Sequence, residues 1–321
     1  MAVPTNTVQT FQRGNIREDL TDIISNISPT ETPFISNIGT GMCKQRLHEW
    51  QVDTLIAAVN NNAQIEGNDA VALAAPGTNR RNNYCQLADK VVSVSDTARA
   101  VNNAGYSDEL AYQMAKRSKE LKRDIELSCT SNNPAVPGNA GLAGQSAGAV
   151  AFIISNRSQG ATGAAPTLSG STTGYPNAGE TLGTLRSITE SMVKTVMAAA
   201  WTAGGSPTIV NTSGVIKQTM STFAGIAQQR RETKNKAATI IGAADVYVSD
   251  FGDLTFVPSR FTTGRNALVL DPSLWMLADL QPYQTVDLAK TGHSDKKMLF
   301  REWTLVCENE SGNGNIADVQ P

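Results

Sequence analysis

The chain has 321 residues, with 27 Lys and Arg against 29 Asp and Glu, so its formal net charge is −2. Charged residues make up 17% of the sequence, below the roughly 25% usual in soluble domains, which favours a surface partly covered by other protein. This balance excludes nucleic-acid binding by bulk positive charge. No apolar stretch is long enough for a membrane-spanning helix.

Residues that could hold metals or form disulfides are widely scattered. The cysteines show no C-x-x-C spacing and the two histidines lie far apart, so we expect no disulfide framework, no zinc site and no cofactor. The N-terminus lacks a basic region followed by an apolar one, which predicts no secretory signal and action in the cytoplasm of the producing cell. These residues are Cys43, Cys85, Cys129, Cys307, His48 and His293.

The first residues are expected to be extended, with one short helix. Apolar residues at helical spacing predict this helix over Arg17–Asn26, and Pro29 and Pro33 are expected to end it. An irregular connector should follow. Its apolar anchors are Phe34, Ile35 and Ile38.

A protruding β-hairpin is predicted next. Residues Arg46–Thr54 alternate between two faces, as a strand does, and Asn82–Asp96 form a second extended run. Residues 55–80 between them are rich in Ala, Asn and Gly and cannot form a core of their own. A hairpin of this kind is marginal alone in water, so it needs a surface to lie on.

The strongest helical pattern runs over Ser107–Leu127, with Ser107 as the expected N-cap. Lys122 and Glu126 are expected to pair as i,i+4 neighbours. Five basic residues fall within Lys116–Arg123. They indicate either a solvated face or a contact with nucleic acid or with a neighbour's acidic residues. The apolar stripe of the helix consists of Leu110, Met114, Leu121 and Ile125.

Residues 132–183 form a region of different composition. Arg157 and Glu180 are its only charged residues, and it is rich in glycine. We expect a loop-rich insertion with one strand over Ala149–Ile154.

The following part of the chain has a regular pattern that predicts a compact unit of helices and short strands. Helices are expected over 185–201 and Ser213–Arg231. Residues 282–308 are expected to be mostly extended. The predicted short strands are 207–211, Ala244–Ser249, Leu254–Pro258 and Ala267–Leu270.

One motif suggests an enzyme. Gly144–Gly148 match the G-x-S-x-G nucleophile elbow around Ser146, and Asp271 and His293 follow in the right chain order. The context is wrong, because the apolar run follows the motif instead of preceding it. A serine hydrolase therefore stays a remote alternative. Since no other clustered acid, base or phosphate-binding motif is present, the sequence favours a non-enzymatic role.

Several segments together resemble one known family. They are REDLTDIISNISPTETPFISNIG, LHEWQVDTL, EGNDA, ELAYQMAKRSKELKRDIE, WTAGG, IIGAADVYVSDFGDLTFVPSRF and LDPSLWMLADLQPYQTVDLAKTGHSDKKMLF. In chain order, from about residue 11 to 310, they resemble the major capsid proteins of tailed bacteriophages, which have the Hong Kong 97 type capsid fold. The specificity lies in the segments occurring together.

The resemblance implies an α+β fold of four parts. An N-terminal arm would occupy residues 1–45 and an extended loop, the β-hairpin, residues 46–95. A peripheral domain with a long spine helix would comprise residues 96–134 and 281–321. An axial domain would comprise residues 135–280.

The resemblance also implies a function. The chain would be a structural subunit, assembled in the host cytoplasm as hexamers and pentamers into the icosahedral head of a virion. The head would enclose double-stranded DNA without sequence-specific binding and without a membrane. Expected partners are a portal, a decoration protein and a separate scaffolding protein, since the arm begins almost at Met1. The alternative is an encapsulin-like cellular compartment shell of the same fold.

Residues of the hairpin are the candidates for contacts between subunits, because aromatic side chains carry much interface energy. The alternative is that they pack within their own subunit. The type protein of this fold crosslinks a loop lysine to a neighbour's asparagine, but Gln51 to Asp89 contain no lysine here, so we expect no such crosslink. The contact candidates are Trp50, Val52, Tyr84 and Leu87.

Overall fold

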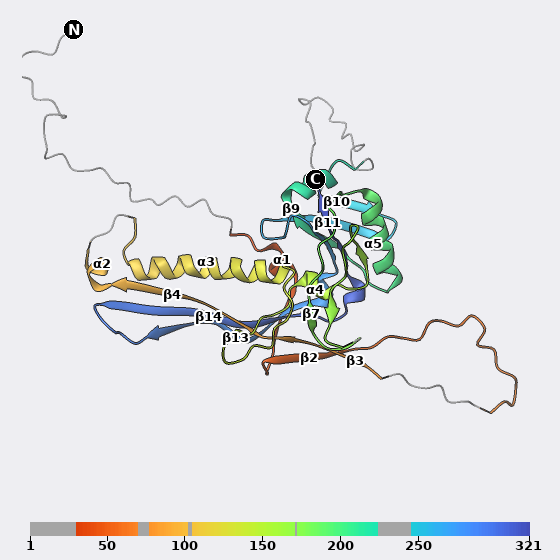
Figure 1. Ribbon diagram of the computed structural model, residues 1–321, viewed down its shortest axis with the longest axis horizontal. Coiled ribbons are helices and arrows are strands. Elements are labelled where there is room, and N and C mark those ends of the chain that lie inside the picture. Colours follow the sequence, from red (N-terminus) through yellow and green to blue (C-terminus); the bar gives the residue numbers. More distant parts are fainter. Residues whose placement is uncertain (1–29, 70–76, 102–104, 171, 224–244) are drawn as a thin grey trace, which may run out of the picture.

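The computed structural model describes residues 30–69, 77–101, 105–170, 172–223 and 245–321. An elongated part, in which a long helix lies along a four-stranded sheet, joins a rounder part built on a six-stranded sheet (Figure 1). A hairpin extends from their junction, below and beyond the rounder part in this view (Figure 1). The helix expected over Arg17–Asn26 lies outside the described residues, as does the end of the one expected over Ser213–Arg231.

The sheet of the elongated part has the strand order β1-β13-β14-β4. β14 pairs antiparallel with both β13 and β4, while β1 pairs parallel with β13. The extended conformation expected for 282–308 is thereby largely confirmed. The strands are β1 (Gly39–Met42), β4 (Gln86–Ser95), β13 (Trp275–Leu288) and β14 (Ser294–Cys307).

The long helix α3 (Glu109–Thr130) packs along β4 and β14 and confirms the predicted spine helix. Its N-cap is Asp108, whose carboxylate accepts the backbone N–H of Leu110, and not the expected Ser107. The predicted stripe faces the sheet, with Met114 partly buried. A short helix, α2 (Asp96–Ala100), precedes it. The buried members of the stripe are Leu110, Leu121 and Ile125.

The expected pair of Lys122 and Glu126 does not form, because the connector covers Glu126. Pro33 begins the short helix α1 (Pro33–Asn37) instead of ending one, since proline suits the first turn of a helix. The buried Glu126 carboxylate accepts the backbone N–H groups of Phe34 and Ile35 at 2.8 and 2.9 Å. Burial raises the pKa of Glu126, and these two hydrogen bonds oppose the shift. The predicted anchors Phe34 and Ile38 are buried.

The sheet of the rounder part has the order β10-β11-β9-β12-β15-β5. The expected strands of this region are confirmed. Two helices, α5 (Glu190–Thr202) and α6 (Gly214–Met220), pack against the sheet. The strands are β5 (Arg157–Ser158), β9 (Ile209–Ser213), β10 (Val246–Ser249), β11 (Gly252–Ser259), β12 (Ala267–Leu270) and β15 (Gly314–Ile316).

The prediction of a helix over 185–201 was wrong at its start. Residues of β8 (Arg186–Ser187) are extended because they pair with β16 (Val319–Gln320). Leu185 is consequently exposed. The face of α5 that is buried consists of Val193, Val196, Met197 and Ala200.

The hairpin is shorter than expected. β2 (Leu47–Val52) pairs antiparallel with β3 (Asn79–Tyr84). The second extended run, predicted over Asn82–Asp96, is interrupted at Cys85, so that only its first residues belong to the hairpin. β4 then leaves the hairpin and pairs with β14 over its whole length. The boundary predicted for the extended loop at residue 95 therefore coincides with the end of β4 in the four-stranded sheet. Alternation alone could not show that the run has two different partners.

The predicted strand over Ala149–Ile154 was also wrong. Ala149–Phe152 form the short helix α4, which is buried, because a short apolar run fits a buried helix as well as a strand. The rest of the insertion is loop with a small ribbon of β6 (Thr167–Leu168) and β7 (Pro176–Ala178).

The last residues lie outside the four-stranded sheet, and the assignment of 281–321 to a peripheral domain stays a prediction. β15 lies between β12 and β5 in the six-stranded sheet, and β16 pairs with β8. Two short 3₁₀ helices lie between strands, η2 (Pro272–Leu274) before β13 and η3 (Glu310–Gly312) before β15.

Candidate functional site

The residues of the nucleophile motif do not form an active site. Ser146 is fully buried, and its Oγ accepts hydrogen bonds from Asn83 Nδ2 at 3.0 Å and from the backbone N–H of Leu305 at 3.1 Å. Asp271 caps η2, while the exposed His293 lies beside Asp96. The serine therefore stabilises the junction of β3 and β14, and its oxygen is not free to act as a nucleophile.

The described residues show no other arrangement typical of catalysis or metal binding. No group of three or more His, Cys, Asp or Glu side chains is gathered there as a metal site needs. No helix within the described ranges is long and apolar enough to cross a membrane.

The root of the hairpin is fixed tightly to the body. Cys43 and Cys85 lie with their Sγ atoms 3.5 Å apart, in a buried cluster with Ala278 and Val306. Burial raises the pKa of both thiols, most strongly that of Cys85. Arg46 also donates to the carbonyl oxygen of Pro137 in the insertion. These contacts set the direction in which the hairpin leaves the body.

The predicted contact residues lie in two different environments. The ring of Trp50 packs on the core beside Phe152, with ring centroids 6.1 Å apart, and Tyr84 meets Tyr175 edge to face at 5.1 Å. Val52 is partly buried, and Leu87 is 60% exposed on β4.

The tip of the hairpin was not singled out from the sequence. After β2 the chain carries apolar side chains that are mostly exposed, although the protein has few charged residues with which to keep such a loop soluble in water. Several exposed apolar side chains within one short loop favour a contact with another protein surface. We call this group the tip residues: Leu55, Ile56, Val59 and Ile65, exposed by 98%, 65%, 68% and 81%.

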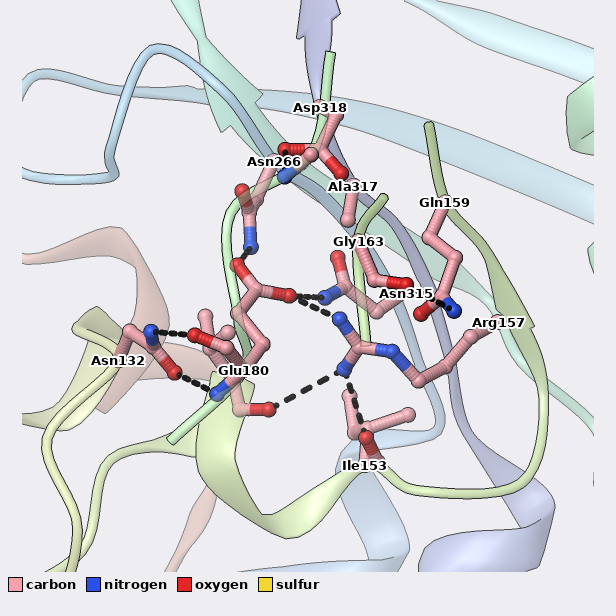
Figure 2. A network of polar contacts seen from close by, with 12 residues as sticks. Asn132, Ile153, Arg157, Gln159, Gly163, Glu180, Asn266, Asn315, Ala317 and Asp318 are labelled. Carbon is pink, nitrogen blue, oxygen red and sulfur yellow. Dashed lines mark hydrogen bonds and ion pairs between the residues drawn. The ribbon is translucent and has the colours of Figure 1, made fainter. Parts of the chain in front are cut away.

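The insertion is held by a buried polar network (Figure 2). Arg157 and Glu180 form an ion pair whose side chains are only 4% and 3% exposed. Glu180 also accepts from Asn266 Nδ2 at 2.7 Å and from Asn315 Nδ2 at 3.2 Å. The Asn132 side chain binds the Glu180 backbone N–H and carbonyl. The network thus joins the insertion to the loop before β12 and to β15.

A second carboxylate ties the C-terminal strand to the same region. Asp318 is buried and accepts the backbone N–H groups of Gly160 and Gly183, together with Nη2 of Arg265 at 2.8 Å. Burial opposes its ionisation, but these donors hold the pKa of Asp318 below its ordinary value. The two networks make the insertion a fixed part of the rounder unit.

The profile of the SU10 major capsid protein family matches residues 3–320. The chain belongs to this family. A major capsid protein of Escherichia phage Phieco32 is 40% identical over 126 residues, which span 39% of this chain and 36% of that protein. Members of the family are structural shell proteins and not enzymes, which agrees with the buried Ser146.

Solved structures show the same fold at low sequence identity. The capsid protein of cyanophage A-1(L) matches with a TM-score of 0.67 at 12% identity, over 98% of this chain and 100% of that one. The encapsulin SrpI of Synechococcus elongatus matches with a TM-score of 0.54 at 9% identity, over 98% and 96%. The expected Hong Kong 97 type α+β fold is confirmed.

Proposed function

We propose that this capsid protein is the repeating subunit of an icosahedral phage head, in which it forms hexamers and pentamers around a double-stranded DNA genome. The observation that carries this proposal is the hairpin, which is rigid at its root and apolar at its tip. The tip residues find no cover among the described residues of their own subunit. A neighbouring copy would bury them, and a subunit held at several such sites gains effective concentration at each.

The proposed domains follow the two sheets, and their boundaries are taken from the strand pairing. The hairpin of β2 and β3 would be the extended loop, α3 with the four-stranded sheet the peripheral domain, and the six-stranded sheet with β16 the axial domain. The axial parts would meet around the capsomer centres. Residues before α1 would form the arm.

The contact candidates are proposed in a revised order of weight. Leu87 and the tip residues present apolar surface to solvent, so they are the strongest candidates for contact with a neighbour. Trp50, Val52 and Tyr84 would act mainly by holding the hairpin in its direction, since Trp50 and Tyr84 pack on their own core. A scaffolding protein, a portal and a decoration protein stay predictions.

Electron microscopy of the purified full-length chain tests the assembly proposal. Uniform closed shells are expected from the wild type, or from the wild type with its scaffold. Replacing Leu55 and Ile56 together by Ser should leave the subunit folded by circular dichroism but prevent closed shells. Replacing the exposed Leu142 and Leu182 in the insertion by Ser is the matched control. Normal shells from the tip variant would contradict the role of the hairpin.

The encapsulin-like alternative makes a different prediction about contents. A compartment shell would hold protein cargo, whereas a phage head would hold a genome. Nuclease-protected DNA in particles from infected cells supports the head. Particles that enclose only protein would support the compartment.

A further inference from the structure

One face of α3 carries positive charges that the fold does not use. The side chains of Lys116, Lys119 and Lys122 are exposed, and Arg123 is partly exposed. Positions three and four apart share a helix face, and this face turns away from the buried stripe that meets the sheet. We call Lys116, Lys119, Lys122 and Arg123 the basic face.

Acidic residues of the same stretch do not neutralise this face. Glu120 is held by Arg117 at 2.5 Å, and Asp124 is held by Lys90 of β4 at 2.6 Å. Glu126 is buried under α1. Within the described residues, no ion pair involves any of the four cations of the basic face. A chain of net charge −2 therefore presents a local concentration of positive charge.

We propose that the basic face contacts the phosphates of double-stranded nucleic acid inside the shell, which places α3 on the inner side. This inference rests on the proposed function. At about 1.5 Å per residue, Lys116 to Arg123 extend over about 10.5 Å. One DNA strand carries a phosphate about every 3.4 Å along the helix axis, so about three phosphates of a strand fall within reach.

The composition of the face favours nucleic acid over an acidic protein partner. Lysine is a strongly hydrated point charge without the planar fork that grips a carboxylate at two points. Lysine is also depleted in protein–protein interfaces, where aromatic residues, Met and Arg are enriched. Three lysines suit a contact that holds phosphates, carries no sequence information and tolerates sliding.

The salt dependence of DNA binding by the unassembled full-length subunit tests this inference. Binding to a 30-base-pair duplex of random sequence is measured by fluorescence anisotropy at several NaCl concentrations. Each phosphate contact contributes about 0.9 to the slope of log K against log salt. The triple variant Lys116→Gln, Lys119→Gln and Lys122→Gln should lower that slope by about 2.7. Undetectable binding by the wild type at low salt would overturn the inference.

A charge-matched control separates a specific face from total charge. The variant Lys44→Gln, Lys194→Gln and Lys296→Gln removes as much charge from the loop before β2, from α5 and from β14. It should keep the wild-type slope, and equal loss in both triple variants would overturn the inference. Tighter binding of the wild type to polyglutamate than to the duplex would also overturn it, in favour of an acidic protein partner.

Particles provide a second measurement, which does not depend on DNA binding by the unassembled subunit. Formaldehyde treatment of DNA-filled particles, followed by mass spectrometry, should give nucleotide adducts at Lys116 or Lys119. Adducts only at lysines outside α3 would contradict an inward face. Shells formed by the triple variant show that assembly persists without the contact. Failure of the wild type to form any shell, with or without its scaffold, would instead refute the proposed function, whatever the DNA binding shows.

Discussion

Arg157 and Glu180, the only charged residues between positions 132 and 183, form a buried ion pair with each other. Arg157 Nη1 also donates to the carbonyl oxygen of Ile153 at 2.8 Å. The pair lies at the centre of the network in Figure 2, where the insertion meets β15 and the loop before β12. The region predicted as a loop-rich insertion is thus held at its centre by its two charged residues.

Replacing Glu180 by Ala should therefore destabilise the subunit severely. The Arg157 guanidinium would be left buried without its partner, a change that costs about 3–5 kcal/mol. Urea unfolding of the unassembled subunit measures the difference. The pair of Lys194 and Glu190 at the surface is the control, since Lys194→Ala should cost far less than Glu180→Ala. Similar losses in the two variants would contradict a structural role for the buried pair.

Glu126 should make stability depend on pH. Burial raises its pKa in the folded chain above the value of about 4.3 for an unfolded chain. The folded state then holds the proton more strongly, so this residue's contribution to stability is greatest below about pH 4.3 and is lost as pH rises through the folded pKa.

A comparison with Glu126→Gln isolates this effect, because Gln does not titrate. The unfolding free energy of the wild type minus that of the variant should fall between pH 4 and pH 8. Thermal unfolding of the unassembled subunit over this range checks the prediction. Parallel curves for the two proteins would show that Glu126 does not titrate differently in the folded chain.

Ser146→Ala tests the structural account of the nucleophile motif. Removing the hydroxyl leaves the Leu305 N–H without its buried acceptor, while Asn83 Nδ2 keeps the Leu305 carbonyl oxygen at 2.7 Å, so the change should cost about 1–3 kcal/mol. Hydrolysis of a model ester should be the same, at background level, in both proteins. A wild-type esterase activity that the variant loses would restore the hydrolase alternative.

Mature particles should contain no covalently linked subunits of the type known from this fold. The residues from Gln51 to Asp89, which include the loop between β2 and β3, offer no lysine amine for an isopeptide bond. A denaturing gel should show one band near 34.1 kDa. A ladder of multimers after boiling and reduction would contradict the prediction.

The sequence predicted those elements whose pattern is strong over many residues. The spine helix has a long apolar stripe, and the hairpin strand around Trp50 alternates clearly. Predictions failed where the conformation or burial of a residue depends on a partner that is distant in the sequence. Cys85 divides two strands with different partners, and α1 covers Glu126, which local spacing placed on the surface.

Part of the candidate site could also have been predicted from the sequence. Arg157 and Glu180 stand alone in a stretch that is otherwise free of charged residues. This isolation indicates that the two side chains pair with each other, because a lone buried charge is costly. The tip residues carried a weaker signal, since apolar side chains in an Ala- and Asn-rich loop gain meaning only once their exposure is known. The exposure of Leu87 and the packing of Trp50 likewise depend on tertiary structure.

The position of the hairpin in an assembled shell tests the central claim most directly. An electron cryomicroscopy map of shells made from the full chain should show the tip residues Leu55, Ile56, Val59 and Ile65 against a neighbouring subunit. Their exposed surface, now nearly complete at Leu55, should be largely buried there. A hairpin folded back on its own subunit, or free of contact in closed shells, would contradict the account.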